Sequence, residues 1–211
     1  MAEVTTAEAS EQAHATSLGL SNEKLAMWTL LGSECLFFGA LIAAYLVYYG
    51  RYNGQPEISP QLFDIPFTSV STFVLLMSSL GMVLALSAIQ RGDDRAFRIW
   101  ILSTALMGTV FLSGQIYEFT VFVAEGMRLD TSPFTSSFYM MTTFHGLHVT
   151  VGVLMLITLW SRSMTGRLTS ENAEVVENVG LYWHFVDIVW IVIFTAVYLI
   201  PFEQVTGRIV E

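Results

Sequence analysis

Residues 136–160 read SSFYMMTTFHGLHVTVGVLMLITLW, a long apolar run that contains no Asp, Glu, Lys or Arg. A membrane-spanning helix needs roughly 20 mostly apolar residues, because each residue adds ~1.5 Å and the hydrocarbon core is ~30 Å thick. The run therefore predicts a transmembrane helix. It also carries His145 and His148, which lie three residues apart and so on one face of that helix. Because ionisable groups at membrane depth usually face protein or water, the surroundings of these histidines are the central question.

Four further segments of the same kind accompany this run. The chain is 54% hydrophobic and 13% charged, whereas a typical soluble domain has about 25% charged residues. We predict an all-α, polytopic transmembrane bundle of five helices, over residues 25–49, 67–90, 97–124, 136–160 and 180–200. These helices make one membrane domain, residues 25–202, between a polar N-terminal tail, residues 1–24, and a short C-terminal tail, residues 203–211.

The basic residues predict the orientation of the bundle, because cytoplasmic loops of membrane proteins carry an excess of Lys and Arg. The flanks on the side of the N-terminus hold Lys24, Arg91, Arg95, Arg98, Arg162 and Arg167, and the other flanks hold Arg51, Arg128 and Arg208. We therefore expect the N-terminus in the cytoplasm and the C-terminus outside. The net charge of −9 does not suit a nucleic-acid binder, and the single cysteine, Cys35, excludes an internal disulfide and a cysteine-based metal cluster.

Depth in the membrane suggests which polar residues meet. At ~1.5 Å per residue, Glu34 lies ~14 Å from the cytoplasmic end of its helix, and His148, on a helix that runs the other way, lies ~18 Å from that face. We therefore expect a hydrogen bond between Glu34 and His148, with Glu34 protonated at neutral pH, since burial disfavours the charged form. Glu118 lies ~31 Å up, near the outer surface, and matches neither histidine.

His184 and Asp187 are three residues apart on the last helix and could support each other. With that helix starting at residue 180, they would lie in its cytoplasmic third, at ~6 Å and ~10 Å. Structural support or contact with a partner subunit is favoured over catalysis for both. Arg162 and Arg167 either follow the positive-inside rule or bind lipid headgroups.

Two interpretations stay open for Glu34: a neutral carboxyl satisfied by a hydrogen bond, or a group that handles protons. For His145 and His148, packing and hydrogen bonding between helices are favoured over metal or heme ligation. A zinc or copper site would need further ligands, and two histidines that ligate a heme usually come from different helices.

Five stretches, one in each predicted helix, carry a family resemblance. They are SECLFF at 33–38, TFVLLMSS at 72–79, QIYEF at 115–119, TFHGLHV at 143–149 and YWHFVDIVW at 182–190. Over roughly residues 22 to 202, the chain resembles subunit III of the heme–copper oxidases, both cytochrome c oxidase and quinol oxidase. The histidine stretch and the last stretch are the most specific.

The resemblance implies an accessory subunit of a respiratory terminal oxidase, in the bacterial cytoplasmic (inner) membrane. Such a subunit has no catalytic residue and no metal, because heme and copper are held by partner subunits. It packs on subunit I, in a complex with subunit II and small subunits, and the complex can join a respiratory supercomplex. It also holds phospholipid, supports the proton-uptake entrance of subunit I and protects the active site during turnover.

Individual residues follow from the same resemblance. Glu34 aligns with the carbodiimide-reactive glutamate of the family, and Arg162 aligns with an arginine that binds a lipid headgroup. The longer form of the family has two helices ahead of the glutamate helix, and part of its lipid cleft is built from them. This chain resembles the five-helix form of bacterial oxidases, in which another subunit can fill those positions.

Three alternatives to a cytochrome c oxidase subunit remain. The first is subunit III of a quinol oxidase. The second is a diheme membrane anchor that uses His145, His148 and His184. The third is a proton-coupled transporter built on Glu34, against which the odd number of helices argues, since many transporters are built from inverted repeats.

Overall fold

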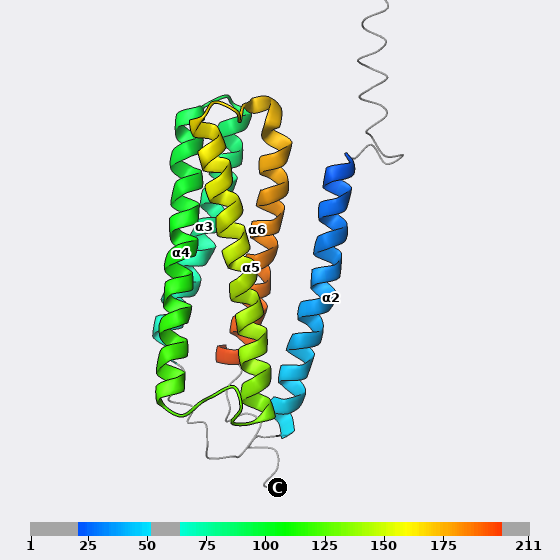
Figure 1. Cartoon of the computed structure of the whole chain (residues 1–211), viewed down its shortest axis with the longest axis vertical. Helices are drawn as coiled ribbons and strands as arrows, with labels where there is room; N and C mark the ends of the chain where they lie inside the picture. Colours follow the sequence, from blue (N-terminus) through cyan, green and yellow to red (C-terminus); the bar gives the residue numbers. More distant parts are fainter. Residues whose placement is uncertain (1–20, 52–63, 200–211) are drawn as a thin grey trace, which may run out of the picture.

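The structure, a computed structural model, describes residues 21–51 and 64–199 (Figure 1). In these residues five helices are long and apolar enough to cross a membrane, and no strand occurs. They are α2 (Asn22–Arg51), α3 (Ile65–Gln90), α4 (Asp94–Ala124), α5 (Pro133–Met164) and α6 (Ala173–Phe194), with a 3-10 turn, η2 (Ser170–Asn172), before α6 and a π-helix, η3 (Thr195–Leu199), after it. The predicted all-α fold with five spanning helices is confirmed.

Several helices begin earlier than predicted, because polar residues ahead of the apolar segments are also helical. Helix α5 begins at Pro133, because Ser132 and Thr135 form a capping box in which each side chain binds the backbone of the other. Helix α2 already begins at Asn22, within the predicted polar tail. The rest of that tail and the predicted C-terminal tail lie outside the described residues, as does Ile200.

The predicted start of the last helix at residue 180 was wrong, since α6 begins at Ala173. Its first turns are polar, a composition that predicts a loop. Two acids in these turns bind the start of α2: Lys24 Nζ lies 2.5 Å from Glu177 Oε1, and Ser21 donates to Glu174. Acids are also favourable near a helix N-terminus, where the helix dipole is positive.

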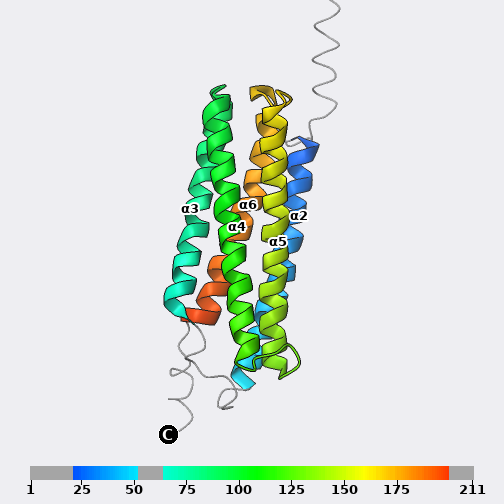
Figure 2. The same ribbon diagram turned by 60° about the vertical axis from the view of Figure 1, so that its left-hand side comes forward.

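Helices α3 and α4 are joined by a tight turn and run side by side (Figures 1 and 2). The turn contains Gly92 in the left-handed region, with φ of 73°, which glycine adopts without steric cost. Asp93 then caps α4 by accepting a hydrogen bond of 3.0 Å from the backbone N–H of Ala96. The polar turn predicted between the second and third helices is therefore present.

The indole of Trp183 fills the centre of the group formed by α3, α4, α5 and α6. Its side chain is 1% exposed. A Cβ atom built on Gly108 of α4 or Gly152 of α5 would lie only 2.6 Å or 2.7 Å from its ring. These two glycines therefore allow α4 and α5 to approach α6 closely, as small residues do at helix contacts in membranes.

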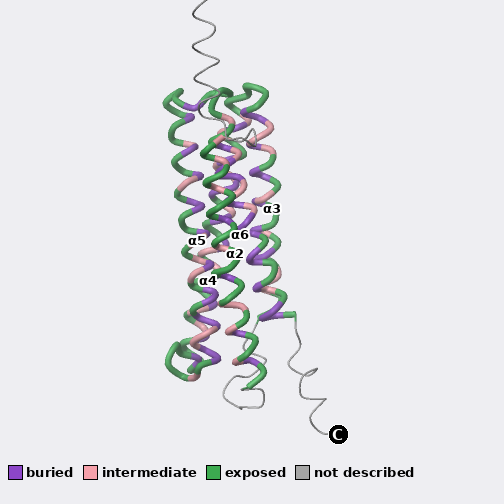
Figure 3. The backbone as a smooth tube through the Cα atoms, turned by 90° about the vertical axis from the view of Figure 1, so that its right-hand side faces the viewer, coloured by how far each residue is buried: buried purple, intermediate pink, exposed green. Residues whose placement is uncertain are grey.

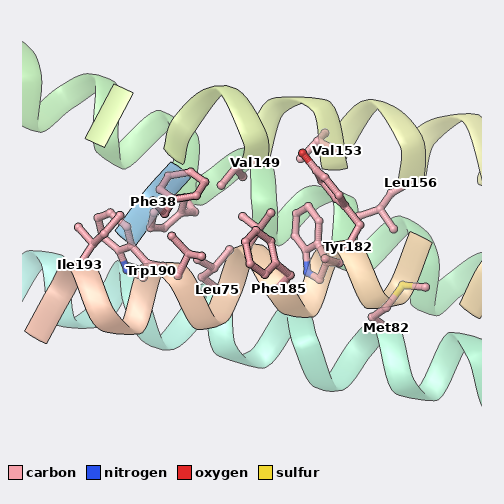
Figure 4. Close-up of a cluster of buried hydrophobic side chains, with 14 of the residues drawn as sticks. Phe38, Leu75, Met82, Val149, Val153, Leu156, Tyr182, Phe185, Trp190 and Ile193 are labelled. Atoms are coloured by element: carbon pink, nitrogen blue, oxygen red, sulfur yellow. The ribbon is translucent and has the colours of Figure 1, made fainter. Parts of the chain in front are cut away.

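Helix α2 stands beside this group and contacts α5 and α6 (Figure 1). Its buried residues, Leu31, Phe38, Tyr45 and Tyr49, recur mostly at intervals of seven, which is the spacing of a coiled-coil seam. Phe38 reaches from α2 into the core between α5 and α6 (Figure 4), where its ring lies 6.4 Å from that of Phe185. Most of the remaining surface of α2 is exposed (Figure 3).

Candidate functional site

Glu34 of α2 and His148 of α5, which were predicted to match in depth, lie together. His148 Nε2 is 3.3 Å from Glu34 Oε2, and the two side chains are 19% and 22% exposed. The contact has the distance of an ion pair but not the geometry of a hydrogen bond, because Glu34 Oε2 has no hydrogen-bond partner among the described residues. The predicted proximity is therefore present, whereas the predicted hydrogen bond is not formed in this structure.

The contact of the other ring nitrogen of His148 determines which nitrogen carries the hydrogen when the ring is neutral. His148 Nδ1 lies 2.7 Å from the carbonyl oxygen of Phe144, and a carbonyl oxygen only accepts, so Nδ1 carries a hydrogen. In a neutral imidazole Nε2 then has none, and an ionised Glu34 would place two acceptors opposite each other. A hydrogen bond between the two side chains therefore needs a hydrogen on the Glu34 carboxyl or on His148 Nε2.

Aromatic side chains from α2 and α6 hold His148 in place. The ring of Phe38 meets its imidazole edge to face at 5.0 Å. Tyr182 stacks on it with ring centres 6.4 Å apart and donates a hydrogen bond of 3.2 Å to the backbone carbonyl of His148. Three helices thus converge on the Glu34–His148 pair.

His145 lies in a different environment from His148. It is 0% exposed, and its Nε2 is 3.2 Å from the carbonyl oxygen of Val186 on α6, so Nε2 is the donor. Its ring packs against Phe111 and Trp190, with centres 5.8 Å and 4.8 Å away. The structure therefore does not bring the two histidines to one site: one is enclosed in the core and the other lies at the contact with α2.

Glu118 ties α4 to two other elements near the end of the bundle opposite the predicted cytoplasmic face. The residue is 8% exposed, accepts a hydrogen bond from the Thr68 hydroxyl of α3, and lies 3.4 Å from the Tyr198 hydroxyl of η3, which also donates to it. It contacts neither histidine, in agreement with its predicted depth.

His184 and Asp187 of α6 meet at a residue that the sequence did not single out for this role, Ser79 of α3. His184 Nδ1 lies 2.5 Å from Ser79 Oγ. Neither oxygen of the nearby Asp187 carboxyl has a hydrogen-bond partner in the described parts of the chain. Asp187 is 3% exposed, and His184 is partly exposed. We call these three residues the Ser79 trio.

The predicted depth of His184 and Asp187 in the membrane was wrong, because α6 begins at Ala173 and not at residue 180. From Ala173, His184 lies ~17 Å along the helix, and a further ~22 Å remains to Leu199. The trio is therefore near the middle of the bundle rather than in its cytoplasmic third.

Two further hydroxyls of α3 bind indoles of α6. Trp183 Nε1 donates to Ser78 Oγ at 3.0 Å, and Trp190 Nε1 donates to Thr72 Oγ1 at 2.9 Å. The stretch at 72–79 thus supplies acceptors for the stretch at 182–190. The sequence shows these hydroxyls on α3, but it does not show that α3 lies beside α6, and so it does not predict that they bind the two indoles.

The two arginines expected to bind lipid headgroups are exposed near the end of α5. Ser163, between them, accepts hydrogen bonds from the side chain of Arg98 at its hydroxyl and its carbonyl, at 3.0 Å and 2.8 Å. A hollow of about 600 Å³ lies at the opposite end, between α2 and the start of α5. It is lined by Leu41, Ala44, Tyr48, Asp130, Thr131, Ser132, Pro133, Ser136, Ser137 and Met140. The hollow is therefore separate from Arg162 and Arg167.

Comparison with known proteins identifies the family. Residues 3–201 match the family model of cytochrome c oxidase subunit III. The chain belongs to this family. Within the described residues, no group of three or more His, Cys, Asp or Glu side chains is arranged to hold a metal ion.

Relatives of the subunit III family carry two kinds of name. Cytochrome c oxidase subunit 3 of Bacillus sp. (strain PS3) is 40% identical over 178 residues, which are 84% of this chain and 86% of that protein. Cytochrome c oxidase subunit 3 of Thermostichus vulcanus is 37% identical over 177 residues, 83% and 86% of the two chains. Quinol oxidase subunit 3 of Bacillus spizizenii is 37% identical over 175 residues, 83% and 85% of the two chains.

The resemblance to heme–copper oxidase subunit III is therefore confirmed. This subunit III is a multi-pass membrane protein and part of a respiratory oxidase complex.

Proposed function

We propose that this subunit III is the non-catalytic flank of a proton-pumping terminal oxidase that reduces oxygen to water with electrons from cytochrome c. It lies in a bacterial inner membrane with its N-terminus in the cytoplasm. It packs directly on subunit I, beside subunit II and small subunits, and these partners hold the heme and copper. Glu34, His148, His145, Glu118, His184 and Asp187 act as polar contacts that hold the bundle and its partners in place.

One observation carries the proposal of a supporting role. Each histidine in the described residues uses at least one ring nitrogen on a protein group: His145 on the Val186 carbonyl, His148 on the Phe144 carbonyl and His184 on the Ser79 hydroxyl. His145 is in addition enclosed between aromatic rings. These bonds suit contacts between helices, and the enclosure of His145, whose Nε2 is engaged, disfavours a diheme anchor built on the same three residues.

The support has two further parts. The Glu34–His148 pair remains partly exposed at the side of the bundle, so it can contact subunit I near the proton-uptake entrance. Arg162 and Arg167 bind phospholipid headgroups at the end of α5, where both side chains are exposed and the membrane surface offers anionic groups.

The proposal is tested with the purified oxidase, prepared with and without this chain. We expect both forms to have the same heme spectrum and similar initial rates of oxygen consumption. The form without the chain should lose activity progressively during turnover and take up protons more slowly. Loss of heme with the chain, or a Soret band of the isolated chain that disappears in His148→Ala, would establish the diheme anchor instead.

The electron donor is tested on the same preparation. We expect oxidation of reduced cytochrome c at a rate that supports oxygen consumption, and no comparable rate with a quinol. The opposite preference would assign the chain to a quinol oxidase and leave its supporting role intact.

A further inference from the structure

Helix α2 is held unevenly along its length. Beyond Glu34 its seam buries three aromatic side chains, Phe38, Tyr45 and Tyr49. Of the α2 residues before Glu34, all of which the structure describes, only Leu31 is buried. Apolar contact adds little to the hold on a helix in a membrane, because lipid tails are as apolar as a neighbouring helix. The first turns of α2 therefore depend on polar contacts for their position.

These polar contacts join the start of α2 to the start of α6. Lys24 Nζ lies 2.5 Å from Glu177 Oε1, and the Ser21 hydroxyl donates to Glu174. Lys24 and Glu177 are 25% and 37% exposed, so dissolved salt screens the attraction between them. Ion pairs at such exposure are weak. The start of α2 can therefore separate from α6 at little cost in free energy.

Gly32 and Ser33 provide a point about which the first turns of α2 can bend. Pairs of glycine and serine are among the recognised sites of helix kinks. The Ser33 hydroxyl donates a hydrogen bond of 2.7 Å to the carbonyl oxygen of Leu30, and bonds of this kind often bend a helix. A Cβ atom built on Gly32 would have no atom within 4 Å. No neighbouring side chain in the described residues therefore opposes bending on that side of the helix.

We propose that residues 22–31 of α2 form a hinged strap, which swings away from α6 about Gly32 and Ser33 when its polar contacts with the start of α6 are released. High salt or loss of the Lys24 charge releases these contacts. The rest of α2 stays in place, because its buried aromatic side chains lie beyond the hinge. The strap is a moving part of the chain, which adds to the proposed supporting role and is the same in either kind of oxidase.

Opening of the strap changes the surroundings of the Glu34–His148 pair. Leu31 lies one turn before Glu34 on the same face of α2, and it is on the strap side of the hinge. In the closed strap it lies between the pair and the polar contacts at the start of α2. When the strap opens, Leu31 leaves with it. The pair thus has a covered and an uncovered state, although its two residues remain together in both.

The test uses the complete oxidase in lipid nanodiscs, with two spin labels on a chain in which Cys35→Ala removes the native cysteine. The labels are attached after Leu25→Cys in α2 and Val175→Cys in α6, at side chains that are 39% and 36% exposed. Pulsed electron paramagnetic resonance measures the distance between them. We expect one short distance at low salt, and a second, longer distance at high salt or after Lys24→Met. A single unchanged distance under all three conditions would overturn the proposal.

A second pair of labels beyond the hinge is the matched control. It is attached after Val47→Cys in α2 and Met140→Cys in α5, at side chains that are 53% and 45% exposed. We expect the distance between these labels to be independent of salt. An equal change in both pairs would show that α2 separates as a rigid rod, and would refute a hinge within it.

Gly32→Ala tests the position of the hinge. The added methyl group has space, and alanine favours a regular helix more than glycine does. We expect this variant to reduce the population at the longer distance severalfold at high salt. Gly39→Ala is the matched control, since its methyl group also has no atom within 4 Å and lies beyond the hinge. The same effect of both substitutions would refute the assignment of the hinge to Gly32 and Ser33.

Discussion

Trp190 of α6 donates a hydrogen bond of 2.9 Å from its indole nitrogen to the hydroxyl of Thr72 on α3. Both residues are buried, with 2% and 7% of their surface exposed. Trp183 forms the corresponding bond with Ser78 at 3.0 Å. The contact between α3 and α6 therefore combines large indole rings with single, directed hydrogen bonds, and this fixes how one helix is positioned along the other.

Thr72→Val should destabilise the folded bundle, because it leaves the indole N–H of Trp190 buried without an acceptor. We expect a loss of about 1 kcal/mol in the free energy of unfolding in detergent or bilayer, in the range found for hydrogen bonds between membrane helices. Thr150→Val is the matched control, since Thr150 is exposed and bonds only to the carbonyl of Gly146 in its own helix. Equal effects of the two substitutions would contradict the importance of the Thr72–Trp190 bond.

Gly152→Ala should disturb the packing of α5 on α6, since its Cβ would lie 2.7 Å from the ring of Trp183. Trp183 is 1% exposed and cannot easily move. We expect a cost of about 1–3 kcal/mol, typical of overpacking in a filled core, measured by unfolding of the isolated chain. Gly39→Ala has no atom within 4 Å of the new methyl group and should leave stability unchanged or raise it.

Glu34→Gln should leave oxygen reduction by the assembled oxidase largely intact, because no electron passes through Glu34. The substitution also removes one carboxyl from the infrared spectrum, which identifies the band of Glu34. We expect that band to report a protonated acid at neutral pH, as the depth of Glu34 in the membrane predicts. Complete loss of activity in a fully assembled variant, or an ionised carboxylate at neutral pH, would refute these expectations.

Breaking the ion pair between Lys24 and Glu177 should have a small effect. The side chains are 25% and 37% exposed and their charged atoms are 2.5 Å apart. Ion pairs at such exposure contribute about 0–1 kcal/mol and weaken with salt. A double-mutant cycle with Lys24→Met and Glu177→Gln, measured by unfolding at low and high salt, should give a coupling energy in this range. A larger, salt-independent coupling would show that the pair fixes the start of α2 more firmly.

The sequence predicted the number of helices because apolar length alone determines which segments can span a membrane. It also predicted that Glu34 and His148 meet, since two antiparallel helices place residues of equal depth side by side. It did not predict that His145 and His148 lie in different environments. Three residues turn a helix by ~300°, so side chains at this spacing diverge by ~60°, and here one enters the core while the other meets α2.

The Ser79 trio and the two indole bonds could not be predicted, because the sequence does not show which helices are neighbours. The start of α6 was missed for another reason. Its first turns carry Glu174 and Glu177, which resemble a loop until Ser21 and Lys24 are seen to bind them. Both failures concern contacts between segments that are distant in the chain.

The narrow seam of α2 has a consequence for the synthesis of the protein. Chains are made from the N-terminus at about 5–20 residues per second, so α2 is complete before α5 and α6, its only extensive contacts in the described structure, exist. During that interval Glu34 has no His148 to meet, and an ionised carboxylate would hinder retention in the bilayer. The predicted neutral form of Glu34 would let α2 remain in the lipid until α5 and α6 are made.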